Sequence, residues 1–321
     1  MTKRAPTVTV VVAARDAAGT LTDAVRSALA APDVVQCLVV DDASTDATAA
    51  TASALAASDA RVELVGRPTR GGPSAARNDG LVRARGARVC FLDADDALEP
   101  GGLGVLGGAM TASPGAVGAV GRFRAVDGEG ADVDVGTWAI AQLRPVVRRH
   151  RRHVESPDGL SPEALVTRLV SPPPGAWLLD TAVTRAVGGF DVRTRRSEDL
   201  ELLVRLAAAG GVVAVDDDVL AYRRHAAQRS AAHRRRRWGR GQALWSMLRA
   251  APGARATLRL SRGMVAYHLE LAGARWRDGS PRVRAMGARN LVAAAALACG
   301  GRLAAVLPRR MPAPLDAVAV D

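Results

Sequence analysis

The sequence predicts an α/β fold in which helices flank a mostly parallel sheet. Short apolar runs rich in β-branched residues alternate with segments that open on Thr or Ser and are often rich in Ala. An uninterrupted apolar run is typical of a parallel strand that is covered on both faces. Regular alternation of such strands with helices favours a sheet built from crossover units. The chain has 321 residues, enough for one large domain with an appendage.

The first third of the chain contains four expected strands separated by three expected helices. The strands are apolar runs at residues 7–13, 36–40, 61–65 and 89–92. The helices lie between them, at residues 20–30, after Asp46 to about residue 57, and at residues 74–86. Thr20 and the segment Ser44–Asp46 would cap two of these helices, since their side-chain oxygens can accept orphan backbone N–H bonds. This order predicts a Rossmann-like half-sheet.

The pattern is weaker after residue 114. A strand is expected near residues 118–121, and residues 127–160 are interpreted as a variable surface excursion. Pro172–Pro174 would form a rigid connection, because proline suits neither a helix interior nor an inner strand. A leucine-rich stripe predicts a helix that starts near Glu198. Two closing strands are expected at residues 212–215 and 219–222.

Charged residues gather where three of the expected strands end. The groups are Ala14–Asp16, Asp41–Asp42 and Asp93–Asp96. In parallel sheets, ligands collect beyond the carboxyl ends of the strands. Three carboxylates as close as those of Asp93–Asp96 are costly unless a cation or hydrogen bonds separate them. An oxygen-rich group of this kind suits a hard divalent ion that also holds a substrate phosphate.

Charge is unevenly distributed along the chain. The net charge is +12, but residues 1–120 carry 11 basic against 13 acidic residues, and the remainder carries 33 against 19. A basic second half favours anionic partners such as lipids or phosphates. Cys37, Cys90 and Cys299 are widely spaced, which favours reduced thiols in a cytoplasmic protein. The apolar stretch 291–307 contains Arg302 and is short for a membrane span.

An ordered set of motifs resembles the family 2 glycosyltransferases, inverting enzymes with the GT-A nucleotide-sugar fold. The matching segments are Val8–Asp16, Val39–Asp46, Gly71–Gly80, Phe91–Asp96, Gly188–Asp191, Ser197–Asp199 and Tyr222–His225. They cover roughly residues 6–230, so the resemblance implies a GT-A domain over residues 1–230. Residues 231–321 would be a helical, arginine-rich extension.

The resemblance implies which residues would hold the donor nucleotide. Asp42 would accept a hydrogen bond from an N–H of uracil or another base. Ala13 and Arg15 would line the nucleotide pocket, and Arg77 would lie near the diphosphate. Asp95 would contact the ribose or the metal. The donor would be a UDP-, GDP- or dTDP-sugar. Relatives often have Pro and an aromatic residue near Ala13–Asp16, so base stacking here would be weaker or come from elsewhere.

The resemblance also implies a metal and a catalytic base. Asp93 and Asp95 match the D-x-D motif, and Asp96 would coordinate Mg²⁺ or Mn²⁺ bridging the diphosphate. His225 would reach the metal or the pyrophosphate, although a lone histidine is more often a solvated loop residue. Asp199 matches the base that deprotonates the acceptor hydroxyl, with Glu198 as its helper.

Asp199 has other interpretations that the residues alone leave open. It could be a charge that stabilises a helix N-terminus. Arginines nearby could lower its pKa or bind an anionic acceptor. They are Arg193, Arg195, Arg196 and Arg205.

The basic C-terminal part has two interpretations. Arginines and tryptophans over residues 233–276 could contact a membrane peripherally, at the inner face of a membrane, as would suit a lipid-linked acceptor. Alternatively, this part is a helical appendage that packs on the catalytic domain. No recognised reader motif favours specific nucleic-acid binding.

The expected activity is transfer of a sugar from a nucleotide-diphosphate donor to a hydroxyl acceptor in glycan or cell-envelope synthesis. One rival is a sugar-nucleotide nucleotidyltransferase, but the Gly-rich loop expected after its first strand is absent from Ala13–Asp16. The other is a non-catalytic anion- or membrane-binding protein on the same scaffold. That rival predicts loss of the acidic residues, yet Asp42, Asp95, Asp96 and Asp199 are all present.

Overall fold

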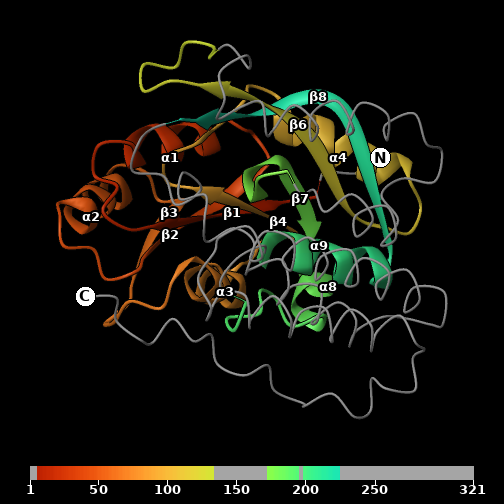
Figure 1. Ribbon diagram of the computed structural model, residues 1–321, viewed down its shortest axis with the longest axis horizontal. Helices are drawn as coiled ribbons and strands as arrows, with labels where there is room; N and C mark the ends of the chain where they lie inside the picture. Colours follow the sequence, from red (N-terminus) through yellow and green to blue (C-terminus); the bar gives the residue numbers. More distant parts are fainter. Residues whose placement is uncertain (1–5, 134–171, 195–197, 225–321) are drawn as a thin grey trace, which may run out of the picture. The chain divides into compact units, whose positions relative to one another are not determined.

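The computed structural model describes residues 6–133, 172–194 and 198–224, and these form one α/β layered structure (Figure 1). The strands are β1 (Val8–Ala14), β2 (Val34–Asp41), β3 (Val62–Gly66), β4 (Arg88–Asp93), β5 (Ala97–Leu98), β6 (Ala116–Val126), β7 (Trp177–Asp180) and β8 (Gly211–Arg223). The helices are α1 (Leu21–Leu29), α2 (Thr48–Ser58), α3 (Pro73–Arg83), α4 (Gly102–Ala112), α8 (Thr181–Ala186) and α9 (Glu198–Ala209), and a 3₁₀ turn, η1, spans Pro174–Ala176.

The strands form an eight-stranded mixed sheet in the order β3-β2-β1-β4-β7-β6-β8-β5. β3, β2, β1 and β4 are parallel, as the alternating pattern predicts. β7 runs antiparallel to both β4 and β6, whereas β6 and β8 are parallel. Figure 1 shows α1 and α4 on one side of the sheet and α3, α8 and α9 on the other. The predicted α/β fold with flanking helices is therefore confirmed.

Burial on both faces explains the sequence of the central strands. Val10, Val11 and Val12 of β1 have no exposed surface, and neither do Leu38 and Val39 of β2. A strand covered by helices on both faces gains free energy from apolar residues at every position, so the period-2 alternation disappears. The hydrophobic core thus fixes the parallel half of the sheet.

The register of the parallel strands places their charged ends side by side. Ala13 of β1 lies opposite Val40 of β2 and Asp93 of β4. Ala14 then lies opposite Asp41. The residues that follow β1 and β2 and the last residue of β4 therefore meet at one edge of the sheet, as the sequence predicts.

α2 begins at Thr48, shortly after the expected capping segment Ser44–Asp46. Ser44 itself donates its N–H and its hydroxyl to the Asp41 carboxylate and so belongs to the preceding loop, whereas the Asp46 carboxylate accepts the Thr48 N–H at 2.9 Å. The closing strands differ from the prediction, because the two expected strands are one strand, β8. Arg122 pairs with both Asp216 and Asp218 across an irregularity in the β6–β8 register, which keeps this polar stretch in the sheet.

The remaining predictions concern the C-terminal residues, the cysteines and possible membrane-spanning helices. His225, the membrane-contact segment 233–276 and the extension 231–321 lie outside the described residues. Cys37 and Cys90 are buried free thiols, which confirms the prediction for these two cysteines. Among the described helices, none combines the length and the apolarity that crossing a membrane requires.

Close packing of α3 on β1 depends on a glycine. A Cβ atom at Gly80 would lie 2.3 Å from Cγ1 and 2.9 Å from Cγ2 of Val11, whose side chain is fully buried. Val11 cannot move away without disturbing the centre of the sheet. The absence of a side chain at Gly80 therefore lets α3 approach the strand that ends at the charged edge.

We expect Gly80→Ala to lower the free energy of unfolding by about 1–3 kcal/mol, because the added methyl overpacks the contact with Val11. Gly104→Ala in α4 is the matched control. A Cβ there meets nothing within 4 Å, so the better helix propensity of alanine should raise stability by about 0.5–1 kcal/mol. Urea unfolding of both variants measures the difference. Equal effects of the two substitutions would contradict this packing argument.

Candidate active site

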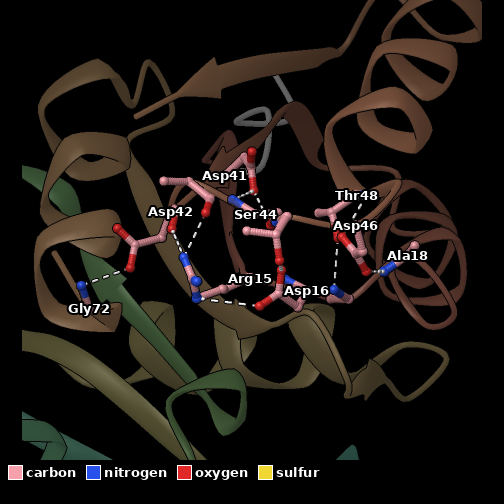
Figure 2. Close-up of polar contacts among 12 residues, drawn as sticks. Arg15, Asp16, Ala18, Asp41, Asp42, Ser44, Asp46, Thr48 and Gly72 are labelled. Atoms are coloured by element: carbon pink, nitrogen blue, oxygen red, sulfur yellow. Dashed lines mark hydrogen bonds and ion pairs between the residues drawn. The ribbon is translucent and has the colours of Figure 1, made fainter. Parts of the chain in front are cut away.

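The loops after β1 and β2 are joined by hydrogen bonds between their polar residues (Figure 2). The Asp16 carboxylate accepts from the Thr45 N–H at 2.8 Å, and the Asp16 N–H donates to Ser44 Oγ at 2.9 Å. The Ala17 N–H donates to Thr48 Oγ1 at 2.7 Å. These bonds cross between segments almost thirty residues apart in the chain. They fix the relative position of the two loops.

Both loops contain a residue in the left-handed region of backbone space. Asp16 has φ 49° and Ala43 has φ 57°, and they are the two non-glycine residues with positive φ in the described part of the chain. This conformation is costly for an alanine and persists only where surrounding contacts impose it. Arg15 supplies such contacts, because its Nη1 donates to the carbonyl oxygens of Asp42 at 2.7 Å and Ala43 at 2.6 Å.

Asp42 follows β2 and is almost fully buried, at 4% exposure. Its carboxylate accepts from the backbone N–H groups of Gly71 and Gly72, each at 2.7 Å, and from Arg67 Nη1 at 2.5 Å. It therefore anchors the loop between β3 and α3. The predicted bond from a nucleotide base to this carboxylate stays a prediction, and such a bond would have to share an acceptor already holding three donors.

The carboxylates of Asp93, Asp95 and Asp96 converge at the end of β4. One oxygen from each lies within 4.8 Å of the others. A turn brings them together, since the Asp96 N–H donates to the Asp93 carbonyl oxygen at 3.1 Å. The prediction that these three residues form a cluster at the strand end is confirmed by this geometry.

Asp96 is the most buried member of this cluster, at 1% exposure. Its Oδ1 accepts from the Arg223 N–H of β8 at 2.9 Å, whereas its buried Oδ2 has no hydrogen-bond partner within the described residues. Burial, together with the like charges of Asp95 and Asp93, holds the pKa of Asp96 well above its usual range. A divalent cation would satisfy the orphan oxygen and remove this penalty, so the all-oxygen donor set fits Mg²⁺ or Mn²⁺.

Arg77 of α3 is a buried charge between two acidic groups. Its Nη2 donates to Asp93, and its Nη1 lies 3.7 Å from the Glu198 carboxylate. Burial works to lower the pKa of Arg77, but Asp93, Glu198 and Asp199 raise it overall. Nε and Nη1 form no hydrogen bond with the described residues. Arg77 is thus fixed by charge pairing while two of its donors remain available.

Glu198 and Asp199 open helix α9. The Leu200 N–H donates to Asp199 Oδ1 at 2.8 Å, so the carboxylate is held at the helix N-terminus. Desolvation and the neighbouring Glu198 raise the pKa of Asp199 to about 7, against the lowering effect of Arg77. A carboxyl with this pKa can exchange a proton near neutral pH, as a general base must.

The expectation that nearby arginines lower the pKa of Asp199 is wrong, because this pKa is raised overall. Arg193 is paired with Asp191, and Arg205 is paired with Glu201. These two guanidinium groups are therefore neutralised by other carboxylates, and burial dominates at Asp199. Arg195 and Arg196 lie outside the described residues.

The turn at residues 188–191 contains Phe190, whose ring faces the guanidinium group of Arg77. Cζ of Arg77 lies 5.2 Å from the ring centroid of Phe190, and this ring packs edge-on against Phe91 of β4 at 4.9 Å. Asn78 holds the turn, because its Nδ2 donates to the Phe190 carbonyl oxygen and its Oδ1 accepts from the Phe190 N–H, both at 2.8 Å. Arg205 adds a bond to the Gly189 carbonyl oxygen at 2.7 Å.

Arg77 thus joins the cluster of Asp93, Asp95 and Asp96 to the pair Glu198 and Asp199. Ala13 is the one residue of β1 that is not fully buried, so it faces the charged edge beside Asp93. Sequence reasoning missed Arg67 and Phe190. An isolated arginine has no distinguishing signal in an arginine-rich chain. Phe190 lies inside the motif segment Gly188–Asp191, so that segment could have indicated it.

Comparisons with known proteins agree with this arrangement. Residues 9–159 match the family model for glycosyl transferase family 2. The succinoglycan biosynthesis protein ExoU of Rhizobium meliloti is 41% identical over 107 residues, which cover 33% of this chain and 31% of that protein. An uncharacterized glycosyltransferase of Haemophilus influenzae is 55% identical over 38 residues, or 12% of this chain and 15% of that protein. The match therefore spans less than a third of either relative.

Solved structures show the same fold at low sequence identity. TarS 1–349 of S. aureus with UDP-GlcNAc has a TM-score of 0.61 and 16% identity, covering 82% of this chain and 73% of that chain. The mannosyltransferase PcManGT of Pyrobaculum calidifontis, with GDP-Man and Mn²⁺, has a TM-score of 0.59 and 20% identity, covering 95% and 79%. The family match shows that residues 9–159 are similar to glycosyl transferase family 2, and the solved structures show that the chain shares the fold of these glycosyltransferases.

Proposed function

We propose that this protein is an inverting glycosyltransferase that moves a sugar from a nucleotide-diphosphate donor to a hydroxyl acceptor. The observation that carries the proposal is the bridge formed by Arg77 between Asp93 and Glu198. An acidic group suited to a metal and diphosphate and a carboxyl with a pKa of about 7 are thereby held on the two sides of one buried cation. Inverting transfer needs both a leaving-group side and a base.

The nucleotide is proposed to lie along the ends of β1 and β2. Ala13 would contact it, and the loops fixed by Arg15 and Asp42 would surround the base. The similar structures contain UDP, UDP-GlcNAc and GDP-Man, which supports a nucleotide sugar as the donor. Preorganised loops favour binding because little ordering entropy remains to be lost. Arg77 would offer its remaining N–H groups to the diphosphate.

Asp93, Asp95 and Asp96 would hold a Mg²⁺ or Mn²⁺ ion, and His225 is a further proposed contact to the metal or the pyrophosphate. Such an ion, when bound, neutralises charge on the departing nucleoside diphosphate. The chain's own part is to hold Asp96 rigidly, through the Arg223 N–H, with its second oxygen directed away from solvent. The similar mannosyltransferase contains Mn²⁺.

Asp199 would remove the proton from the acceptor hydroxyl as this oxygen attacks the anomeric carbon. Glu198 precedes Asp199 and lies 3.7 Å from Arg77, so it would both raise the basicity of its neighbour and orient the acceptor side. The proton goes to the Asp199 carboxylate, and the negative charge leaves with the nucleoside diphosphate. A single displacement of this kind inverts the anomeric configuration.

The acceptor is proposed to be a glycan or a lipid-linked precursor of the cell envelope. A succinoglycan biosynthesis protein is among the similar proteins, which supports a glycan as the product class. Cytoplasmic location, with peripheral membrane contact through residues 233–276, stays a prediction from the basic and tryptophan-rich sequence.

We expect Asp199→Asn to reduce the transfer rate by about 100-fold or more while leaving the affinity for the donor nucleotide nearly unchanged. In the wild type the rate should rise as the pH increases through about 7, because only the ionised carboxylate can accept a proton. The measurement is release of nucleoside diphosphate with acceptor present, recorded between pH 5 and pH 9. Glu129→Gln, on an exposed turn, is the control. Retention of full activity in Asp199→Asn would overturn the assignment.

We expect Asp96→Ala to weaken Mn²⁺ binding at least tenfold, because it removes the buried oxygen that lacks a protein partner. Since the wild-type carboxyl is buried among like charges, the same variant should fold as stably as the metal-free wild type or more stably. Calorimetric titration with Mn²⁺ and thermal unfolding test these two effects. Unchanged Mn²⁺ affinity would exclude Asp96 as a ligand.

A further inference from the structure

Arg67 is fixed at both ends of its guanidinium group beside Asp42. Its Nη1 donates to Asp42 Oδ1 at 2.5 Å, and its Nε donates to Asp79 Oδ2 of α3 at 2.8 Å. Its backbone N–H donates to the Asp41 carbonyl oxygen at 2.9 Å. The Arg67 side chain is only 18% exposed. A long side chain held in this way loses its rotamer freedom, so its remaining donor has a defined position.

The loop that follows is shaped around this guanidinium group. A Cβ atom at Gly71 would lie 2.2 Å from Arg67 Nη1, and Gly72 adopts φ 84°. Both glycines donate their N–H groups to the carboxylate of Asp42. Arg67 and the two glycines therefore form one unit around Asp42, which requires glycine at both positions.

The Asp42 carboxylate is consequently limited in what it can still bind. An ionised carboxylate offers about four acceptor positions and no donor, and three of them are occupied by Arg67, Gly71 and Gly72. Nη2 of Arg67 has no hydrogen-bond partner recorded among the described residues. The pair thus presents one acceptor position and, on the guanidinium group bonded to the same carboxylate, one positively charged donor.

This arrangement complements one class of base edge. Uracil and thymine carry an N–H between two carbonyl oxygens, and guanine carries an N–H beside a carbonyl oxygen. Cytosine and adenine present an unprotonated ring nitrogen at the corresponding position. That nitrogen would face the Asp42 carboxylate without a proton between them, which leaves a buried acceptor unpaired.

We propose that Arg67 is a specificity-determining residue, which holds Asp42 as a single acceptor and donates to the carbonyl oxygen next to the base N–H. The inference rests on the proposed function, since it requires the donor nucleotide to lie against Asp42. It restricts the donors to nucleotides of uracil, thymine or guanine. It also assigns to Arg67 a direct polar contact with the base in addition to its contacts within the protein.

The test compares the affinities of UDP, GDP, CDP, ADP and inorganic pyrophosphate, each with Mn²⁺, in the wild type and in Arg67→Met. In the wild type, UDP or GDP should bind at least tenfold more tightly than CDP and ADP. Arg67→Met should reduce that ratio by about 10- to 100-fold, the value of a charge-assisted hydrogen bond. Pyrophosphate affinity should stay within twofold, because Arg67 does not contact the diphosphate in this proposal.

Two further variants make the result specific. Arg85→Met is the matched control, because Arg85 pairs through its side chain with Glu63 at an exposed site and should not change the ratio. Asp79→Asn keeps Arg67 but removes one of its anchors, so the ratio should fall only about two- to fivefold. Asp79→Asn also provides the test if Arg67→Met does not fold in a thermal unfolding measurement.

The outcomes separate this inference from the proposed function. If the wild type binds UDP or GDP selectively but Arg67→Met keeps the ratio within twofold, the role of Arg67 is overturned and the proposed function stands. Equal weakening of all five ligands in Arg67→Met would also overturn it, since that is the result of a general loss of loop structure. If the wild type binds none of the four nucleotides, both proposals fail.

Discussion

The site depends on one buried guanidinium group, that of Arg77. Its charge has little access to water, so it is stable there only because Asp93 and Glu198 lie next to it. The carboxylates in turn come from different parts of the chain, at the end of β4 and the start of α9. The ion pairs therefore tie the proposed metal side to the proposed acceptor side. The Phe190 ring also packs against Arg77, with its centroid 5.2 Å from Cζ.

The second organising constraint is the shared edge of the parallel strands. Because β1, β2 and β4 are in register, charged residues separated by up to eighty positions meet there. Bringing these charges together is energetically unfavourable. Burial and like charges raise the pKa of Asp96, and Asp16 and Ala43 adopt the left-handed backbone conformation. Hydrogen bonds from Arg15, Arg67 and the two glycines of the next loop compensate by fixing the backbone. The backbone strain therefore lies beside the residues proposed to bind the donor, as is common at functional sites.

Much of this could be predicted from the sequence, since the continuous apolar strands show the parallel half-sheet and the register brings their ends together. Asp93, Asp95, Asp96 and Asp199 were identifiable because carboxylates in ordered motifs resemble a known family. The segment Ser44–Asp46 could be predicted to cap α2, but a single sequence does not show which residue acts, since Ser44 bonds to Asp41 and Asp46 accepts the Thr48 N–H. The raised pKa of Asp199 could not be predicted, because it depends on burial and on Arg193 and Arg205 being neutralised by other partners. Arg67 depends on a contact between distant segments, for which a single sequence has no local signal.

The most direct test of the account is the pH dependence of transfer in Arg77→Met compared with the wild type. If the Arg77 charge stabilises the carboxylates of both Asp93 and Glu198, replacing Arg77 removes the positive charge that lowers the pKa of Asp199. The midpoint of the rising limb of the rate should then move from about 7 to higher pH. A reduced rate with an unchanged midpoint would show that Arg77 acts on the donor alone, and it would contradict the coupling of the two sides.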